Sequence, residues 1–408
     1  MSKNHLLNAL CGSAIMQDEN ALTLRDASPL APFDRRVITF LSDLSGMLLK
    51  DREAKAYPDV VTFAFFCRRA NVLKMKESYA DIAGGTIGRG YVFHIAPSNV
   101  PINFAYSLVS ALLAGNQSVV KASSQDFMQT RIVCRAMSEL LTGMHAALAP
   151  YINVVTYSRD RQDITEMLSA ACHVRVIWGG DETIKRIRQA SIPAHAFDVT
   201  FADRYSVLAI EAKAILGMEE KQLAQTALGF YNDTYLTDQN ACTSPRLIYW
   251  VGDGQVIEMA KQRFWSAVHE YAAPRYEIEP VIAVDKLTAA YRAAIELGGT
   301  HIVQGADNLI ARVSLDELPK NVEEYRCAGG FFIEYGDDTL DALTQVVTRK
   351  YQTLSYIGFE PKDLQAFVRE NGLLGIDRIT PVGKTMDFLF IWDGYDLIRT
   401  FSRHISAL

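Results

Sequence analysis

Between residues 90 and 190, short apolar runs alternate with longer helical segments, and this alternation constrains the fold more than any other feature of the sequence. Four runs rich in β-branched and aromatic residues are expected to be strands: Tyr91–Ala96, Ser118–Lys121, Ile152–Tyr157 and His173–Trp178. The segments expected to be helical are 104–114, 126–141, 161–170 and 181–189. Strict alternation of strand and helix predicts a parallel sheet with helices on both faces.

A second series of strands and helices begins near Tyr205. A helix is expected over 221–232, and a loop then reaches Cys242. Further strands are expected at Arg246–Val251, Gly330–Tyr335 and Gln352–Ile357. The length of 408 residues suits two to three domains. The sequence therefore predicts an α/β protein of two doubly wound domains, 1–213 and 214–408, in which residues 1–80 are mostly helical with a break at Pro58.

Composition narrows the class of protein. Hydrophobic residues make up 49% and charged residues 22%, which is the balance of a folded chain, and the net charge of −6 argues against a nucleic-acid-binding protein. This net charge does not exclude a local basic pocket for one phosphorylated ligand. The longest apolar run, 100–115, contains Asn103 and is too short to span a membrane. The six cysteines are too scattered for a zinc site or a disulfide framework, so we expect reduced thiols and a cytoplasmic protein.

Two glycine-rich segments imitate phosphate-binding motifs. Gly383-Lys384-Thr385 matches the end of a P-loop, but Arg378 stands where the motif needs glycine. The segment 84–90 precedes a strand rather than following one, so a turn is the better interpretation than a dinucleotide fingerprint. Neither segment predicts a phosphate site.

Polar residues and glycines follow three of the expected strands, and ligands of parallel sheets bind at such carboxyl ends. They are Pro97-Ser98-Asn99, Lys121-Ala122-Ser123 and Gly179-Gly180. Each has an ordinary alternative: Asn99 suits a turn as well as an oxyanion donor, and Lys121 suits a solvated strand end as well as a cofactor contact. The glycine pair fits a tight turn or the close approach of a ligand.

Cys242 lies in a polar, turn-forming loop, 238–245, directly before an apolar strand. Structural cysteines usually sit inside apolar runs, as Cys67 and Cys134 do in this sequence. The loop therefore makes Cys242 a candidate nucleophile, with an inert loop cysteine as the alternative. No histidine lies near it in the sequence, and His94 is interpreted as an ordinary strand residue.

The order of these elements resembles the aldehyde dehydrogenase superfamily, and more closely its LuxC-type acyl-CoA reductase branch. The segments that carry the resemblance are 95–101, 114–123, Asn240-Ala241-Cys242-Thr243-Ser244-Pro245, 351–355, and the tail 375–383 with Trp392-Asp393-Gly394. The resemblance implies an aldehyde dehydrogenase-like fold with an active-site cleft between an NADP(H)-binding domain and a catalytic domain.

The resemblance also implies residue roles. Cys242 would take the acyl group, and Asn99 with the Cys242 backbone N–H would hold the thioester oxygen. Lys121 would contact the adenosine ribose. The other residues expected beside the cofactor are Pro97, Ser123, Ser124, Gly179 and Gly180.

Two departures from aldehyde-oxidising relatives bear on the reaction. Ser124 stands where those relatives carry a glutamate for the ribose 2′-hydroxyl, which favours NADPH over NADH. Phe201 aligns with the glutamate that activates the deacylating water, and a phenyl ring is no general base. This second departure favours reduction of an acyl-cysteine over its hydrolysis.

The expected function is thus NADPH-dependent reduction of a fatty acyl thioester to the aldehyde through an acyl-cysteine. The donor would be coenzyme A or a partner acyl-protein synthetase, and the enzyme would be a homo-oligomer. One alternative is a CoA-acylating aldehyde dehydrogenase that oxidises short aldehydes. Another is a non-catalytic scaffold subunit.

Overall fold

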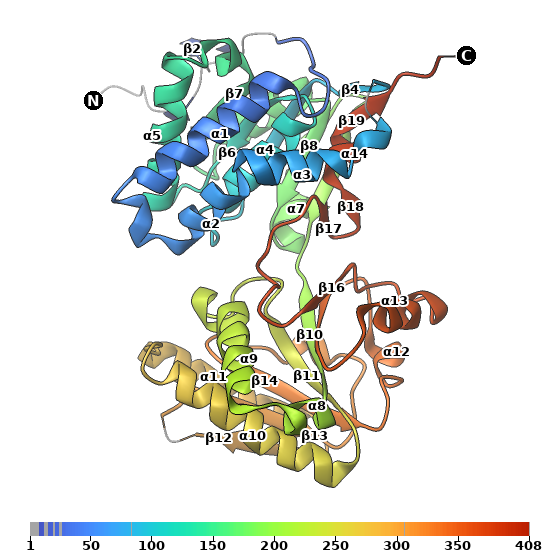
Figure 1. Cartoon of the computed structure of the whole chain (residues 1–408). Coiled ribbons are helices and arrows are strands. Elements are labelled where there is room, and N and C mark those ends of the chain that lie inside the picture. Colours follow the sequence, from blue (N-terminus) through green and yellow to red (C-terminus); the bar gives the residue numbers. More distant parts are fainter. Residues whose placement is uncertain are drawn as a thin grey trace. The chain divides into compact units, whose positions relative to one another are not determined.

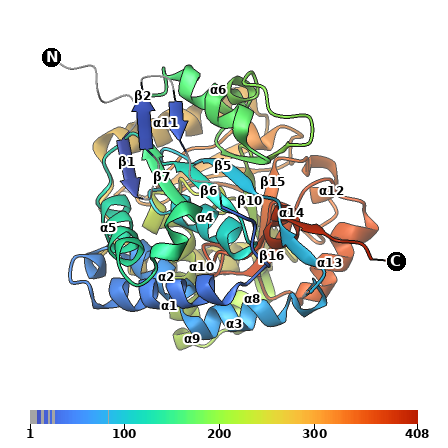
Figure 2. The same cartoon turned by 90° about the horizontal axis from the view of Figure 1, so that it is seen from above.

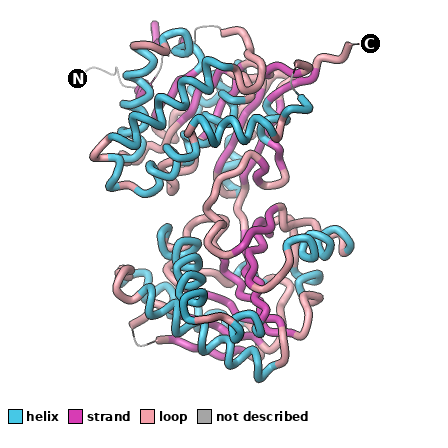
Figure 3. Tube along the Cα trace, in the orientation of Figure 1, coloured by secondary structure: helices cyan, strands magenta, loops and turns pink. Residues whose placement is uncertain are grey.

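The structure is a computed structural model, and it describes residues 8–11, 15–18, 21–23, 27–82, 84–305 and 307–407, without the side chains of 8–23 and of Gln304. Two compact units divide the chain. The first comprises Met1–Ala202 with Phe390–Leu408, and the second comprises Asp203–Leu389. Helices and strands alternate through both units (Figures 1 and 3). This is the α/β architecture that the sequence predicts.

The sheet of the first unit has the strand order β1-β7-β6-β5-β8-β9. Its strands are β1 (Asn8–Cys11), β5 (Tyr91–Ile95), β6 (Gln117–Lys121), β7 (Ile152–Thr156), β8 (Val174–Trp178) and β9 (Phe197–Phe201). All neighbouring pairs are parallel except β1 with β7. The four strands expected from the alternation are therefore confirmed.

Helices cover both faces of this sheet, which explains why the central strands β5 and β8 are buried along their whole length. Seen from above, α6 (Gln162–Ala171) lies on one side, and α4 (Asn103–Leu113) and α5 (Met128–Thr142) lie on the other (Figure 2). Ile164 and Leu168 of α6 pack with Phe93 and Val119 of the sheet, as does α7 (Asp181–Ile187) through Ile184.

The N-terminal region is only partly helical. The helices are α1 (Arg35–Lys50), α2 (Pro58–Phe66) and α3 (Arg69–Glu77), and Pro58 begins α2 as its first residue. Before them, β1, β2 (Ile15–Asp18) and β3 (Ala21–Thr23) are strands. The expectation of a mostly helical region is wrong there. Strand β1 gains backbone hydrogen bonds from the distant strand β7, a pairing that no local pattern reveals, and β2 pairs with β3.

The C-terminal segment returns to the first unit. It contains β17 (Ile391–Trp392), β18 (Tyr395–Asp396), α14 (Leu397–Phe401) and β19 (Ser402–His404), which pairs with β4 (Thr86–Gly88). The buried Asn116 side chain joins three parts of this unit. It accepts the Gly90 N–H and donates to the carbonyl oxygens of Ala111 and Phe401, each at 3.0 Å.

The second unit is built on a sheet of order β12-β13-β14-β11-β10-β15-β16. The strands are β10 (Tyr205–Glu211), β11 (Pro245–Val251), β12 (Thr300–Gln304), β13 (Ala311–Leu315), β14 (Phe331–Asp337), β15 (Tyr351–Ile357) and β16 (Arg378–Pro381). Only β12 runs antiparallel to its neighbour. The expected strands at 246–251, 330–335 and 352–357 are confirmed.

Two sets of helices cover this sheet. On one face, α8 (Ala212–Gly217), α9 (Glu220–Thr234) and α10 (Gly254–Ala272) bury Phe230, Phe264 and Trp265. The other face carries α11 (Pro280–Glu296), α12 (Leu343–Val346) and α13 (Pro361–Glu370). Within the described ranges, no helix has both the length and the apolar character that a bilayer span requires.

The units divide between Ala202 and Asp203, whereas the sequence predicts a boundary near 213. Residue 213 falls inside α8, which follows β10 without a linker. The return of Phe390–Leu408 to the first unit is a second difference. Its cause is long-range pairing, such as that of β19 with β4, which leaves no signal in the local sequence.

Candidate active site

A cavity of about 400 Å³ opens at the carboxyl ends of β5, β6 and β8 in the first unit. It brings together every cofactor or oxyanion residue expected in this unit: Pro97, Asn99, Lys121, Ser123, Ser124, Gly179 and Gly180. The register of the strands explains why these residues lie together, because Ile95 of β5 is level with Lys121 of β6 and Ile177 of β8. Strands that end together place the residues after them at one edge of the sheet.

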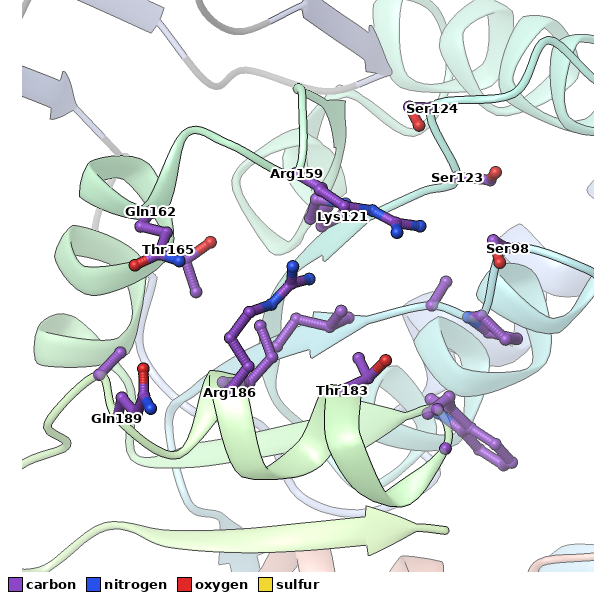
Figure 4. Close-up of a pocket in the computed structure, with 18 of the residues that line it drawn as sticks. Ser98, Lys121, Ser123, Ser124, Arg159, Gln162, Thr165, Thr183, Arg186 and Gln189 are labelled. Atoms are coloured by element: carbon purple, nitrogen blue, oxygen red, sulfur yellow. The ribbon is translucent and has the colours of Figure 1, made fainter. Parts of the chain in front are cut away.

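Three cationic side chains line this cavity. Lys121 ends β6, Arg159 follows β7, and Arg186 lies on α7. The two guanidinium groups reach into the cavity from these different elements (Figure 4). Burial, with the nearby charges of Arg159 and Arg186, lowers the pKa of Lys121. None of the three forms an ion pair within the described part of the chain, so the cavity suits an anionic ligand such as a nucleotide phosphate.

Gly179 and Gly180, which both line the cavity, have different surroundings. A Cβ atom on Gly179 would lie 3.0 Å from Thr183 Cγ2, so the packing of α7 favours glycine there. A Cβ on Gly180 would meet no atom within 4 Å. The close approach of a ligand therefore remains a prediction for Gly180, while Gly179 has a structural reason of its own.

His94, beside the cavity-forming end of β5, is a core residue. Its ring is fully buried and contacts Ser107 Oγ at 2.8 Å and Ser118 Oγ at 3.3 Å. Burial lowers the pKa of His94 to about 3. The ring is therefore neutral at physiological pH, in agreement with its interpretation as an ordinary strand residue.

Cys242 lies in the second unit on a tightly held turn before β11, and it is half-buried. Asp238 and Gln239 both have positive φ, +50° and +58°, a conformation that costs energy in residues other than glycine. The buried Gln239 amide offsets this cost. Its Oε1 accepts the N–H groups of Gly330 and Phe331 at 3.0 Å, and its Nε2 donates to the Pro245 and Phe331 carbonyls.

Hydrogen bonds from other elements hold the same turn. Ser206 Oγ of β10 donates to the Cys242 carbonyl at 2.7 Å, and Ser244 Oγ donates to the Asp233 carbonyl at 2.7 Å. The Asp233 carboxylate in turn accepts the N–H groups of Gly383 at 2.6 Å and Thr385 at 3.1 Å. One buried acid thus joins the end of α9 to the segment 383–385 beside the cysteine turn.

Arg378 on β16 lies within electrostatic range of Cys242. Its guanidinium donates to the carbonyls of Thr385 at 2.8 Å, Lys384 at 2.9 Å and Asp387 at 2.6 Å. Burial lowers the pKa of Arg378, and the charges of Asp387, Asp233 and Cys242 oppose this shift. The apparent P-loop ending at 383–385 is therefore a structural turn bound by an arginine and an aspartate.

Several of these residues were missed by sequence reasoning. Arg159 follows the carboxyl end of β7, so the rule that selected Lys121 could have found it. Arg186 and Asp233 lie within helices and carry no such signal, because only the folded chain brings them to their sites.

Solved structures of similar fold are aldehyde dehydrogenases. A betaine aldehyde dehydrogenase from Staphylococcus aureus is 14% identical, with a TM-score of 0.64. The match covers 92% of this chain and 83% of the dehydrogenase chain. An NADP-dependent glyceraldehyde-3-phosphate dehydrogenase from Bacillus halodurans is also 14% identical, with a TM-score of 0.62 and coverage of 92% and 86%. The chain therefore has the aldehyde dehydrogenase fold.

Within that fold, the sequence matches the acyl-CoA reductase (LuxC) family over residues 70–404. The chain belongs to this family. Curated relatives named long-chain acyl-protein thioester reductase include those of Aliivibrio fischeri, 28% identical over 43% of this chain, and of Vibrio harveyi, 28% identical over 77%. The match spans 35% of the Aliivibrio protein's length and 63% of the Vibrio protein's length.

The Asp233 carboxyl gives the second unit a pH-dependent stability. Burial raises the pKa of Asp233 to about 6, although the N–H groups of Gly383 and Thr385 oppose the shift. Between about pH 4 and 6 the folded protein retains a proton that the unfolded chain has lost. This group therefore makes stability fall as the pH rises, by at most about 1.4 kcal/mol per pH unit.

We expect Asp233→Asn to remove this contribution. The measurement is the urea unfolding free energy of wild type and variant at about pH 4, 5 and 6. The difference between the unfolding free energies of the two proteins should change with pH. A constant difference across this range would contradict the prediction.

Proposed function

We propose that this protein reduces a fatty acyl thioester to an aldehyde through an acyl group carried on Cys242. The observation that carries the proposal is the half-buried cysteine on a turn held by hydrogen bonds, in a chain of the acyl-CoA reductase family. The cavity of the first unit, lined by Lys121, Arg159 and Arg186, supports it by offering a phosphate-binding site.

The reaction has two stages. The Cys242 thiolate attacks the acyl carbonyl, the carbon–sulfur bond to the donor breaks, and the donor leaves as a thiolate. A nicotinamide dinucleotide would supply the hydride that reduces the resulting thioester. The thiohemiacetal oxygen then takes back its carbonyl bond, the aldehyde leaves, and Cys242 regains its thiolate. Asn99 and the Cys242 backbone N–H are proposed to stabilise the oxyanion of both stages.

Two contacts favour reduction over hydrolysis. Phe201, which aligns with the water-activating glutamate of oxidising relatives, is buried and stacks on Trp178 with ring centroids 3.6 Å apart. The nearest carboxylate in sequence, Asp203, forms an ion pair with Arg326. A base for water is therefore missing at this position, and an acyl-cysteine would persist until hydride arrives. This argues against the oxidative alternative.

The cavity favours NADPH as the dinucleotide. Ser124 places a neutral side chain where a glutamate would repel a 2′-phosphate, and Arg159 and Arg186 supply charge to bind one. Lys121 and Ser123 remain candidates for the ribose hydroxyls.

We expect Arg186→Ala to weaken NADPH binding about 10- to 100-fold, because it removes a charge-assisted hydrogen bond worth about 1.5–3 kcal/mol. The same variant should weaken the binding of NADH, which lacks the 2′-phosphate, much less. A second variant, Ser124→Glu, should reverse the preference for NADPH over NADH. Titration calorimetry measures both affinities. Lys185→Ala is the matched control, since Lys185 lies on α7 but does not line the cavity. Equal losses for both nucleotides would refute a 2′-phosphate role.

Cys242→Ala tests the nucleophile. Labelled acyl-CoA should label wild type at this residue, and NADPH should then release labelled aldehyde. The variant should take no label and lose at least about 10³-fold in activity. Cys327→Ala is the control, because Cys327 is the other half-buried thiol among the described residues. Release of acid rather than aldehyde would favour an oxidative or hydrolytic enzyme, and an active variant would favour a scaffold or another nucleophile.

We also propose that Arg378 stabilises the Cys242 thiolate, which would answer how the thiol ionises without a histidine beside it in the sequence. Arg378→Gln removes the charge and should slow alkylation of Cys242 by iodoacetamide at neutral pH about tenfold. Arg378→Lys should retain most of the rate. Peptide mass spectrometry assigns the alkylated cysteine, and equal rates in all three proteins would contradict the role.

The names of the curated relatives point to a long acyl chain and a protein-bound donor. We therefore keep an acyl-protein synthetase as the proposed partner and coenzyme A thioesters as the simpler donors. Homo-oligomerisation and a cytoplasmic location remain predictions from the sequence.

A further inference from the structure

Lys286 on α11 is a completely buried lysine, and it forms no ion pair with any residue that the structure describes. Its ammonium donates instead to the carbonyl oxygens of Asn308, of Leu309 at 3.3 Å and of Gly329 at 2.6 Å. Burial lowers the pKa of Lys286 to about 8. A buried charge that only carbonyl dipoles neutralise is costly, and a methionine would fill a similar volume without that cost. The lysine therefore indicates a role other than packing.

Gly329 connects Lys286 to the cysteine turn of the second unit. The Gly329 carbonyl accepts from Lys286, while the Gly329 N–H donates to the Asp238 carbonyl of the turn at 2.9 Å. The next N–H along the chain, that of Gly330, donates to Gln239 Oε1 at 3.0 Å. The two glycines thus bind the lysine through a carbonyl group and the cysteine turn through their N–H groups.

The two glycines also pack directly against the groups around Lys286, so they must follow any shift there. Both have positive φ, +65° for Gly329 and +87° for Gly330. A Cβ atom on Gly329 would lie 2.5 Å from Ile282 Cγ2 of α11, and a Cβ atom on Gly330 would overlap the Leu309 carbonyl oxygen. Without the ammonium, the carbonyl oxygens of Asn308, Leu309 and Gly329 would lose their shared donor. We expect these carbonyls to move apart and the glycines to move with them.

Arg246 on β11 binds the other end of the same segment. Its guanidinium donates to the Cys327 carbonyl and to the Gln239 carbonyl, each at 2.7 Å. Arg246 therefore ties the segment 327–330 to the cysteine turn directly, whereas Lys286 ties this segment to α11. The turn is held against a support that depends on both cations, and α11 anchors that support.

We propose that Lys286 is a positioning residue for Cys242, acting through the segment 327–330 that supports the cysteine turn. The inference rests on the proposed acyl-cysteine reaction. Lys286 does not line the cavity and binds only backbone carbonyls, so it takes no part in cofactor binding or in the ionisation of the thiol. Its effect is on direction. The turn sets where the Cys242 N–H and sulfur point relative to the acyl carbonyl, and the reaction rate depends steeply on that alignment.

The test compares two reactions of the same thiol in Lys286→Met, which removes the charge and keeps a side chain of similar length. Reduction of acyl-CoA by NADPH needs an aligned thiol and oxyanion donor, so kcat should fall about 10- to 100-fold with little change in KM. Alkylation of Cys242 by iodoacetamide needs a thiolate but no such alignment, and its rate should stay within about twofold of wild type. Unchanged kcat, or a parallel loss in both reactions, would overturn the positioning role.

Lys261→Met is the matched control. Lys261 on α10 is also buried, but it binds Glu258 Oε1 at 2.8 Å and Ser314 Oγ at 3.5 Å rather than any part of the segment 327–330. The general cost of removing a buried lysine should appear in both variants as a lower melting temperature. The selective loss of kcat should appear only in Lys286→Met, and equal losses of kcat in the two variants would show a merely structural role.

Two further variants complete the design. Lys286→Gln keeps an amide that can donate to the carbonyls, so its kcat should lie between those of wild type and Lys286→Met. If Lys286→Met does not fold, Lys286→Gln is compared with wild type in the same two reactions. Cys242→Ala separates this inference from the proposed reaction. If Cys242→Ala still forms aldehyde, the reaction and the inference both fail; if it is inactive while both Lys286 variants keep the wild-type kcat, only the positioning role fails.

Discussion

The parallel pairing of β5 with β6 on one side and β8 on the other is the constraint on which the first unit depends. It aligns Ile95, Lys121 and Ile177 at one level, so the chain must leave all three strands at the same edge. The residues that follow then share one cavity, although they are separated by tens of positions in the sequence. Because the strands are covered on both faces, this edge is where polar groups can meet water or a ligand.

In the second unit, buried polar groups hold the turn that carries Cys242. Gln239 forms hydrogen bonds with the backbone around the turn, and Asp233 accepts hydrogen bonds from the neighbouring segment 383–385. A buried carboxyl carries a free-energy cost, visible in the raised pKa of Asp233. The geometry of the cysteine turn is thus maintained at some expense of stability.

Much of this could be predicted from the sequence because it depends on local patterns. Strand–helix alternation identified the sheets, and position after a strand identified Asn99, Lys121 and the glycines. Arg186 and Asp233 could not be found in this way, since each is one helical residue among many until the fold places it. The strand β1 and the return of the C-terminal segment depend on pairing between distant residues, for which one sequence holds no signal.

The path of the chain between the units has a consequence for biosynthesis. Asn116 and β4 need Phe401 and β19 as partners, so the hydrogen bonds of the first unit can be completed only after synthesis passes residue 400. All residues of the second unit, 203–389, have been made before then. On the ribosome, the first unit is therefore begun first but is the last to complete its backbone hydrogen bonds.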